Sequence, residues 1–138
     1  MQLGTFGAVM RHAIELEDSA SKFYGELTQK APAGARAGIQ ELSDASRKNK
    51  QLLEKTRRME MQEMILETIT GVDTTNYNTS FDATDYKVGL ENARGIERKA
   101  SLFYSDASKK LIFLPNAAKT LEKIGMEREN RIQRIKVL

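Results

Sequence analysis

The stretch IELEDSASKFY, residues 14–24, is nearly repeated as GIERKASLFY at residues 95–104. In each copy a glutamate stands seven residues before the tyrosine of a Phe-Tyr pair: Glu17 before Tyr24, and Glu97 before Tyr104. Residues seven apart lie on one face of an α-helix. Each glutamate therefore falls within an apolar helix face, where an ionised carboxylate is costly unless it has a partner.

The repeat extends along two predicted helices at an offset of 80 residues. Apolar and small side chains recur in both at three- and four-residue spacing, which is typical of amphipathic helices. The first stripe holds Phe6, Met10, Ala13, Glu17, Ala20, Tyr24 and Leu27; the second holds Tyr86, Leu90, Ala93, Glu97, Ala100, Tyr104, Ala107, Leu111 and Leu114. Helix propensity alone does not place a glutamate at the same step twice, so the pattern indicates a structural repeat.

Two further helical segments lie between and after these. One spans about residues 33–69, with the stripe Ile39, Leu42, Ser46, Asn49, Leu53 and Thr56, and continues through a Met-rich run at 59–66 to Ile69. The Met-rich run is apolar on several sides, so we expect it to pack under a connecting segment or at a dimer interface. The other segment runs from about residue 117 to the end.

Turn and capping residues divide the four segments. Thr5 is a candidate N-cap for the first helix, Asp82 or Thr84 for the third, and Asn116 for the fourth. Pro32 can open the second helix, and residues 70–82 form the one long loop. Connections that are short, long and short predict two antiparallel helical hairpins joined by one long crossover. The predicted fold is an all-α, ferritin-like four-helix bundle, with residues 1–138 as a single domain.

Composition excludes several classes of function. The 138 residues include no cysteine, which excludes disulfides, thiolate zinc sites and cysteine nucleophiles. Basic and acidic residues, 22 and 19, are interspersed, so we expect no nucleic-acid partner. No apolar run approaches the roughly 20 residues of a membrane span, so we expect no membrane partner. The N-terminal residues do not resemble a secretion signal, and a cytoplasmic location is the expectation.

Given the two Glu-x6-Tyr helices, the chain resembles the rubrerythrin-like branch of the ferritin-like superfamily over nearly its whole length. The resemblance implies that the second and fourth helices each carry Glu-x-x-His. The four helices would then supply four glutamates and two histidines to a two-iron centre. It also implies a homodimer, since rubrerythrin-like proteins commonly pair. The sequence does not indicate any other protein partner.

The chain departs from that ligand set in the second and fourth helices. Ser46 stands in the place of the second-helix glutamate and Asn49 in that of the histidine. The fourth helix allows two registers, with either Glu127 and Asn130 or Arg128 and Arg131 in the two ligand places. The apolar stripe Leu121, Ile124, Gly125, Ile135 and Leu138 favours the second register.

Neither register supplies a histidine. The one histidine of the chain, His12, lies beside the first stripe, so we expect it at the surface or at the edge of the core.

Three hypotheses follow for Glu17 and Glu97. In the first, Arg128, Arg131 or both replace the metal charge, Ser46, Asn49, Tyr24 and Tyr104 complete a hydrogen-bonded network, and the chain is a non-catalytic structural or interaction module without a cofactor.

In the second hypothesis a metal site of altered type survives. Glu17, Glu97 and Glu127, with carbonyl oxygens of Asn49 or Asn130, would bind a divalent ion; iron or manganese would then support rubrerythrin-type oxidoreductase or peroxidase activity. An all-oxygen ligand set suits Mg²⁺, Mn²⁺ or Ca²⁺ better than iron. In the third hypothesis the emptied core binds a small apolar ligand.

Overall fold

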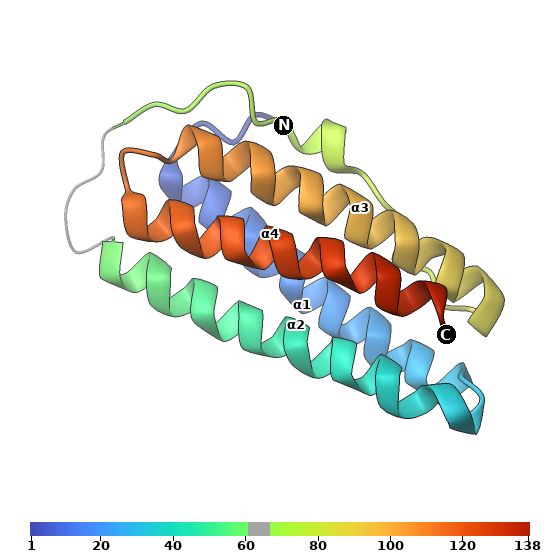
Figure 1. Cartoon of the computed structure of the whole chain (residues 1–138). Coiled ribbons are helices and arrows are strands. Elements are labelled where there is room, and N and C mark those ends of the chain that lie inside the picture. Colours follow the sequence, from blue (N-terminus) through green and yellow to red (C-terminus); the bar gives the residue numbers. More distant parts are fainter. Residues whose placement is uncertain (61–66) are drawn as a thin grey trace.

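The computed structural model describes residues 1–60 and 67–138, and its main elements are four long helices. They are α1 (Phe6–Lys30), α2 (Ala33–Glu60), α3 (Tyr86–Lys110) and α4 (Pro115–Lys136), with a short 3₁₀ helix η1 (Thr74–Tyr77) between α2 and α3. Figure 1 shows α1 antiparallel to α2 and α3 antiparallel to α4, while the connection through η1 returns along the bundle. The predicted all-α bundle with one long crossover is confirmed.

Side chains cap the N-termini of α1 and α3, but the cap of α3 is not one of the predicted residues. Thr5 caps α1, because its side-chain oxygen accepts from the backbone N–H of Ala8 at 3.1 Å. The cap of α3 is Asp85 rather than Asp82 or Thr84, since Asp85 Oδ1 accepts from the N–H of Val88 at 2.8 Å. Asp82 instead accepts from the N–H of Thr84, which closes a turn before the helix.

The predicted cap of α4, Asn116, is also wrong. The helix begins at Pro115, directly after Leu114, and no side chain caps it. Proline suits the first helical position because its fixed φ is helical and it has no N–H to satisfy there.

The prediction that the second helix reaches residue 69 is wrong. α2 spans Ala33–Glu60, and residues 67–70 are not helical. Of the Met-rich run at 59–66, Met59 ends up exposed on the last turn of α2, and residues 61–66 lie outside the described residues. Beyond it the chain pairs with the N-terminal segment: the N–H of Leu3 donates to Val72 O at 2.8 Å and that of Ile69 to Gly4 O at 2.9 Å. Ile69 and Val72 are buried against Leu3, so tertiary packing replaces helix formation here.

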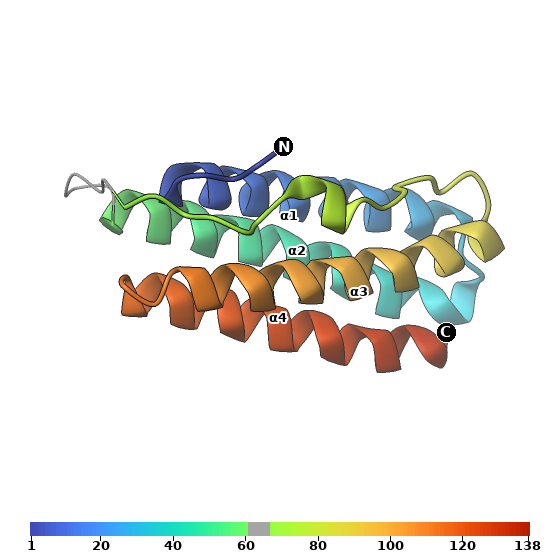
Figure 2. The same ribbon diagram turned by 90° about the horizontal axis from the view of Figure 1, so that it is seen from above.

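The crossover covers the side of the bundle formed by α1 and α3, as Figure 2 shows. Tyr77 of η1 packs edge-on against Phe103, and its hydroxyl donates to Asp106 Oδ2 at 2.7 Å. His12, half-buried on α1, packs against the same Phe103 ring, and burial lowers its pKa. His12 thus lies at the edge of the core, as predicted.

The apolar core consists of two clusters with polar side chains between them. One cluster includes Met10 and Ala13, the other Ala20 and Tyr24, and Glu17 stands between them on α1. The described buried polar and charged residues include Glu17, Ser46, Glu97, Arg128 and Arg131. No helix within residues 1–60 and 67–138 is long and apolar enough to cross a membrane.

Close approach of α4 to α3 depends on Gly125. A Cβ added there would lie 2.9 Å from the Cβ of Tyr104, closer than real Cβ atoms approach. Gly125→Ala should therefore be about 1–3 kcal/mol less stable than the matched variant Gly95→Ala. Gly95 is also within a helix, and its Cβ would meet only Thr79 Oγ1 at an ordinary 3.7 Å. Chemical denaturation measures both, and equal stability of the two variants would contradict this packing.

Candidate functional site

Two glutamates and an arginine meet at the centre of the bundle with no exposed surface. Glu17 of α1, Glu97 of α3 and Arg128 of α4 all have fully buried side chains. Arg128 donates from Nη2 and Nε to Glu17 Oε2, at 2.5 and 3.2 Å, and from Nη1 to Glu97 Oε1 at 2.5 Å. One guanidinium therefore bridges the two repeated glutamates.

The tyrosines of the repeat bind the glutamates reciprocally. Tyr24 of α1 donates its hydroxyl proton to Glu97 Oε1 at 2.6 Å, and Tyr104 of α3 donates to Glu17 Oε2 at 2.7 Å. Each helix thus supplies the acceptor for one bond and the donor for the other. The seven-residue spacing matters because it places each tyrosine two helical turns beyond its own glutamate, level with the partner helix's glutamate.

A second buried arginine extends the cluster toward the surface. Arg131 donates from Nη1 to Ser46 Oγ at 2.8 Å and, more weakly, to Glu97 Oε1 at 3.4 Å. Its Nε donates to Glu127 Oε1 at 2.7 Å, one turn back on α4. The Glu127 side chain is 35% exposed, so it connects the buried cluster to solvent.

The structure has the second register of α4. Arg128 and Arg131 face the core, Asn130 is exposed, and Glu127 lies at the edge. Asn49, half-buried on α2, donates its side-chain N–H to Glu17 Oε1 at 3.0 Å. Of the ten residues singled out from the sequence, nine come together in this cluster, and Asn130 lies outside it.

Charges within the cluster balance among its fully buried members, Glu17 and Glu97 against Arg128 and Arg131. The balance of hydrogen bonds is less complete. Among the described residues, Glu97 Oε2, Glu127 Oε2 and Arg131 Nη2 are buried atoms with no hydrogen-bond partner. Arg128 is therefore the better-satisfied arginine and the main neutralising charge.

The surroundings fix the protonation states of the donors. Burial alone would lower the pKa of Arg128, but the charges of Glu17 and Glu97 outweigh it and hold that pKa well above its usual value. Burial, and then the neighbouring Glu97 charge, raises the pKa of Tyr24 well above normal. Burial and Glu17 do the same for Tyr104. The cluster thus holds a charged guanidinium and two neutral tyrosines at neutral pH.

These donors do not fit a two-iron centre. Such a centre needs carboxylates and imidazoles around two cations, whereas here Ser46 and Asn49 supply only neutral groups. Arg128, a cation, takes up one oxygen of each glutamate. Within the described residues, no group of three or more His, Cys, Asp or Glu side chains is placed to hold a metal ion. The bundle centre is also not the emptied apolar core considered for a small ligand, since it holds Arg128 and Arg131, the largest of the fully buried side chains.

Comparison with solved structures identifies the fold. The chain is similar to a protein from Thermotoga maritima that is described as a ferritin-like diiron-carboxylate protein, with a TM-score of 0.74 and 23% identity over 98% of this chain and 92% of that one. No model of a known protein family matches the chain, and no curated protein matches it. The fold is therefore ferritin-like.

The sequence reasoning missed two features of the site. It did not foresee that Glu127 would bind Arg131, although a spacing of four on one helix is a known signal for an ion pair. It also did not foresee that Arg128 would reach both glutamates, because that depends on how α4 crosses the bundle centre.

Arg128→Met should strand two buried carboxylates. Removing one partner of a buried ion pair typically costs about 3–5 kcal/mol, and we expect a loss of that order in the free energy of unfolding. The matched control is Arg134→Met on the same helix, whose exposed pair with Glu41 should contribute less than about 1 kcal/mol.

Adding Glu17→Gln and Glu97→Gln to Arg128→Met removes the stranded charges and should recover much of the loss. Denaturant unfolding of the parent chain, Arg128→Met, Glu17→Gln/Glu97→Gln and the combined variant completes this double-mutant cycle. If Arg128→Met is as stable as Arg134→Met, the guanidinium does not neutralise the glutamates.

The buried tyrosines should make the fold sensitive to alkali. Their pKa values are raised in the folded state, so the stability they confer is complete below the unfolded pKa of about 10 and falls as pH rises above it. A Tyr24→Phe/Tyr104→Phe variant has no such protons to lose, so its unfolding free energy should fall less steeply above about pH 10. Denaturant titrations between neutral and alkaline pH give the two slopes, and identical slopes would refute the prediction.

Proposed function

We propose that the chain is a rubrerythrin-like member of the ferritin-like superfamily with a degenerate di-iron site, and that it works as a non-catalytic structural or interaction module. In this proposal an arginine takes over the charge that a metal pair supplies elsewhere. The observation that carries it is the bridge from Arg128 to Glu17 and Glu97.

The resemblance and the geometry together support the replacement of a metal pair by arginine. The protein from Thermotoga maritima is described as a ferritin-like diiron-carboxylate protein, and the present chain has the same fold. The two glutamates of the repeat stand at the places that the resemblance assigns to iron ligands. Arg128 and Arg131 occupy the two places where the resemblance calls for Glu and His on the fourth helix.

The alternative function is a metal-binding oxidoreductase or peroxidase with an altered ligand set, using iron or manganese. It would require Arg128 to leave the centre, so that Glu17 and Glu97 could coordinate a cation. Glu127 would also have to leave Arg131, to which it is bound at 2.7 Å. Each movement would expose or strand a buried arginine, which makes this function the less favoured one.

Metal retention distinguishes the two functions. Purified protein is incubated with Fe(II), Mn(II) or Zn(II), desalted, and assayed for bound metal. We expect retention far below one ion per chain and no change on Glu17→Gln, because Arg128 already neutralises that carboxylate. Near-stoichiometric retention that is lost on Glu17→Gln would overturn the proposal.

A rebuilt ligand set provides the positive control. The variant Ser46→Glu/Asn49→His/Arg128→Glu/Arg131→His restores the four glutamates and two histidines that the resemblance calls for. If the arginines replaced the metal, this variant should retain about two Fe(II) ions per chain, while the parent chain retains almost none. Equal retention by the two proteins would show that any bound metal lies elsewhere.

A further inference from the structure

The turn between α3 and α4 exposes two large apolar side chains at one end of the bundle (Figure 1). The N–H of Leu114 donates to Leu111 O at 2.8 Å, which closes the turn. Both of these leucines pack into the core. Between them, Ile112 is 73% exposed and Phe113 is 38% exposed. The centre of an exposed turn is usually glycine, proline or a small polar residue. Ile112 and Phe113 instead form what we call the apolar tip.

The connection between the two helices does not itself require an apolar tip. The other antiparallel pair, α1 and α2, is joined through Ala31 and Pro32, and that connection contains no large apolar residue. The α3–α4 turn is anchored in the core by the leucines on either side of the tip. A single exposed apolar residue is ordinary, but two adjacent ones at the end of a bundle are a candidate interaction surface.

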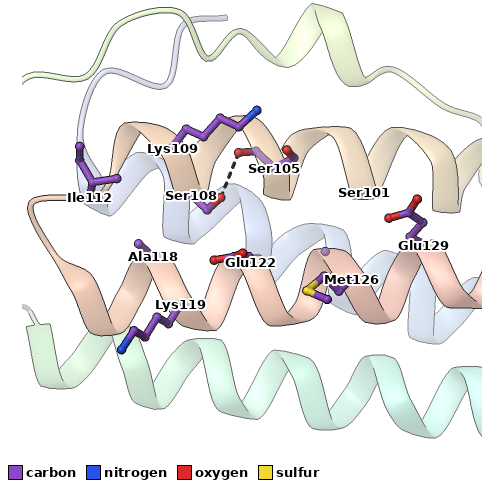
Figure 3. A pocket seen from close by; sticks show the side chains of 11 residues that line it. Ser101, Ser105, Ser108, Lys109, Ile112, Ala118, Lys119, Glu122, Met126 and Glu129 are labelled. Atoms are coloured by element: carbon purple, nitrogen blue, oxygen red, sulfur yellow. Dashed lines mark hydrogen bonds between the residues drawn. The ribbon is translucent and has the colours of Figure 1, made fainter.

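Basic side chains surround the apolar tip. Lys109 of α3 and Lys119 of α4 are exposed on either side of the turn. Figure 3 shows these two lysines near Ile112, with their side chains pointing away from each other. Lys110 is exposed as well. No acidic residue occurs between positions 107 and 121, so the surface around the tip is positive.

Helix dipoles do not account for all of this charge. Lys109 and Lys110 lie in the last turn of α3, where cations offset the negative end of the dipole. Lys119 lies near the start of α4, where the dipole favours acidic residues, yet the first turn of α4 has none. Within residues 1–60 and 67–138, none of the salt bridges involves these three lysines. Their charges are therefore available to an anionic partner.

The last turns of α2 enlarge the surface. Met59, which is 60% exposed, and Lys55 line a hollow of about 220 Å³ together with Asn116 at the start of α4. Glu60 is the acidic residue that lines the same hollow. This end of the bundle thus carries a further apolar side chain and a further cation beside those of the turn.

An apolar tip within a basic surface matches the interface of an anionic lipid bilayer. Apolar side chains can enter the boundary between headgroups and acyl chains, while lysine stems extend so that their ammonium groups stay among the phosphates. Each lysine near such a surface adds attraction to acidic lipids. A nucleic acid would contact the lysines through its phosphates but would leave the apolar pair in water. The expectation of no membrane partner came from the lack of a spanning segment, which a surface contact does not need.

We propose that the end of the bundle that carries Ile112 and Phe113 binds the surface of anionic lipid bilayers. The apolar tip enters the interface, and Lys109 and Lys119 contact the headgroups. The inference rests on the proposed function in that it names the partner of the interaction module. It does not depend on how the core is neutralised, so metal retention and vesicle binding can fail independently.

Co-sedimentation of the full chain with vesicles tests the contact. We expect the chain to sediment with vesicles of equal parts phosphatidylcholine and phosphatidylserine, less so at high salt, and not with phosphatidylcholine alone. Ile112→Asp should lower the partition coefficient roughly tenfold. The matched control is Met126→Asp, because Met126 is 62% exposed on α4 but lies outside the tip; it should bind as the parent does. A parent chain that does not sediment with anionic vesicles would overturn the proposal, as would undiminished binding by Ile112→Asp.

Charge reversal locates the contact on the molecule. Lys109→Glu/Lys119→Glu should lower the partition coefficient roughly tenfold or more, because two attractive charges become repulsive. The control Lys87→Glu/Lys136→Glu changes the net charge equally, at exposed residues of the same two helices near their opposite ends. It should bind nearly as well as the parent. Equal losses in the two double variants would contradict the proposal, since net charge alone would then explain the binding.

Fluorescence tests whether the tip enters the bilayer. The chain has no tryptophan, so Phe113→Trp carries a single indole at the tip. Its emission should shift to shorter wavelength when the anionic vesicles are added, because the indole leaves water. The control is Phe81→Trp on the crossover, where Phe81 packs against Phe23 of α1, and its emission should not change. An unshifted emission from Phe113→Trp in a chain that still sediments would mean a purely electrostatic contact and would overturn the proposal.

Discussion

Two carboxylates with no exposed surface must be neutralised for this bundle to fold, and most of the site's architecture follows from that constraint. Taking an ion out of water costs several kcal/mol even after the protein relaxes, and the cost is recovered only with good geometry and further hydrogen bonds. Arg128 meets this demand because a guanidinium offers donors in several directions. It reaches Glu17 and Glu97 at once, across the centre of the bundle.

The near-symmetry of the repeat explains why one arginine can reach both glutamates. Each half of the chain provides a glutamate and a tyrosine, and the reciprocal bonds from Tyr24 to Glu97 and from Tyr104 to Glu17 join the halves. The second and fourth helices break that symmetry. α2 contributes small neutral groups, Ser46 and Asn49, whereas α4 contributes both arginines. All the positive charge thus comes from one helix, and the small side chains opposite leave room for it.

The sequence was informative where patterns are local and repeated. Helical periodicity and loop lengths predicted the topology, and the interrupted stripe predicted buried Glu17 and Glu97. Sequence patterns failed where contacts between distant segments determine the ends of helices. Several nearby residues could cap α3, and only the approach of the chain selects Asp85. Likewise, pairing with the N-terminal segment holds Ile69 out of the helix that the apolar pattern predicted to reach it. The register of α4 was a weak preference, because a buried arginine and a surface arginine look alike in sequence.

The same constraint accounts for the persistence of a charged core in this bundle. A well-packed apolar core is often at least as stable as a buried ion pair, so stability alone does not require these charges. Any single replacement, however, strands a partner: losing Arg128 leaves two carboxylates, and losing Glu17 leaves Nε and Nη2 of Arg128 and the hydroxyl of Tyr104 without an acceptor. An apolar core is reached only through several coordinated changes. The cluster therefore persists because each partly substituted variant between the charged core and an apolar core is less stable.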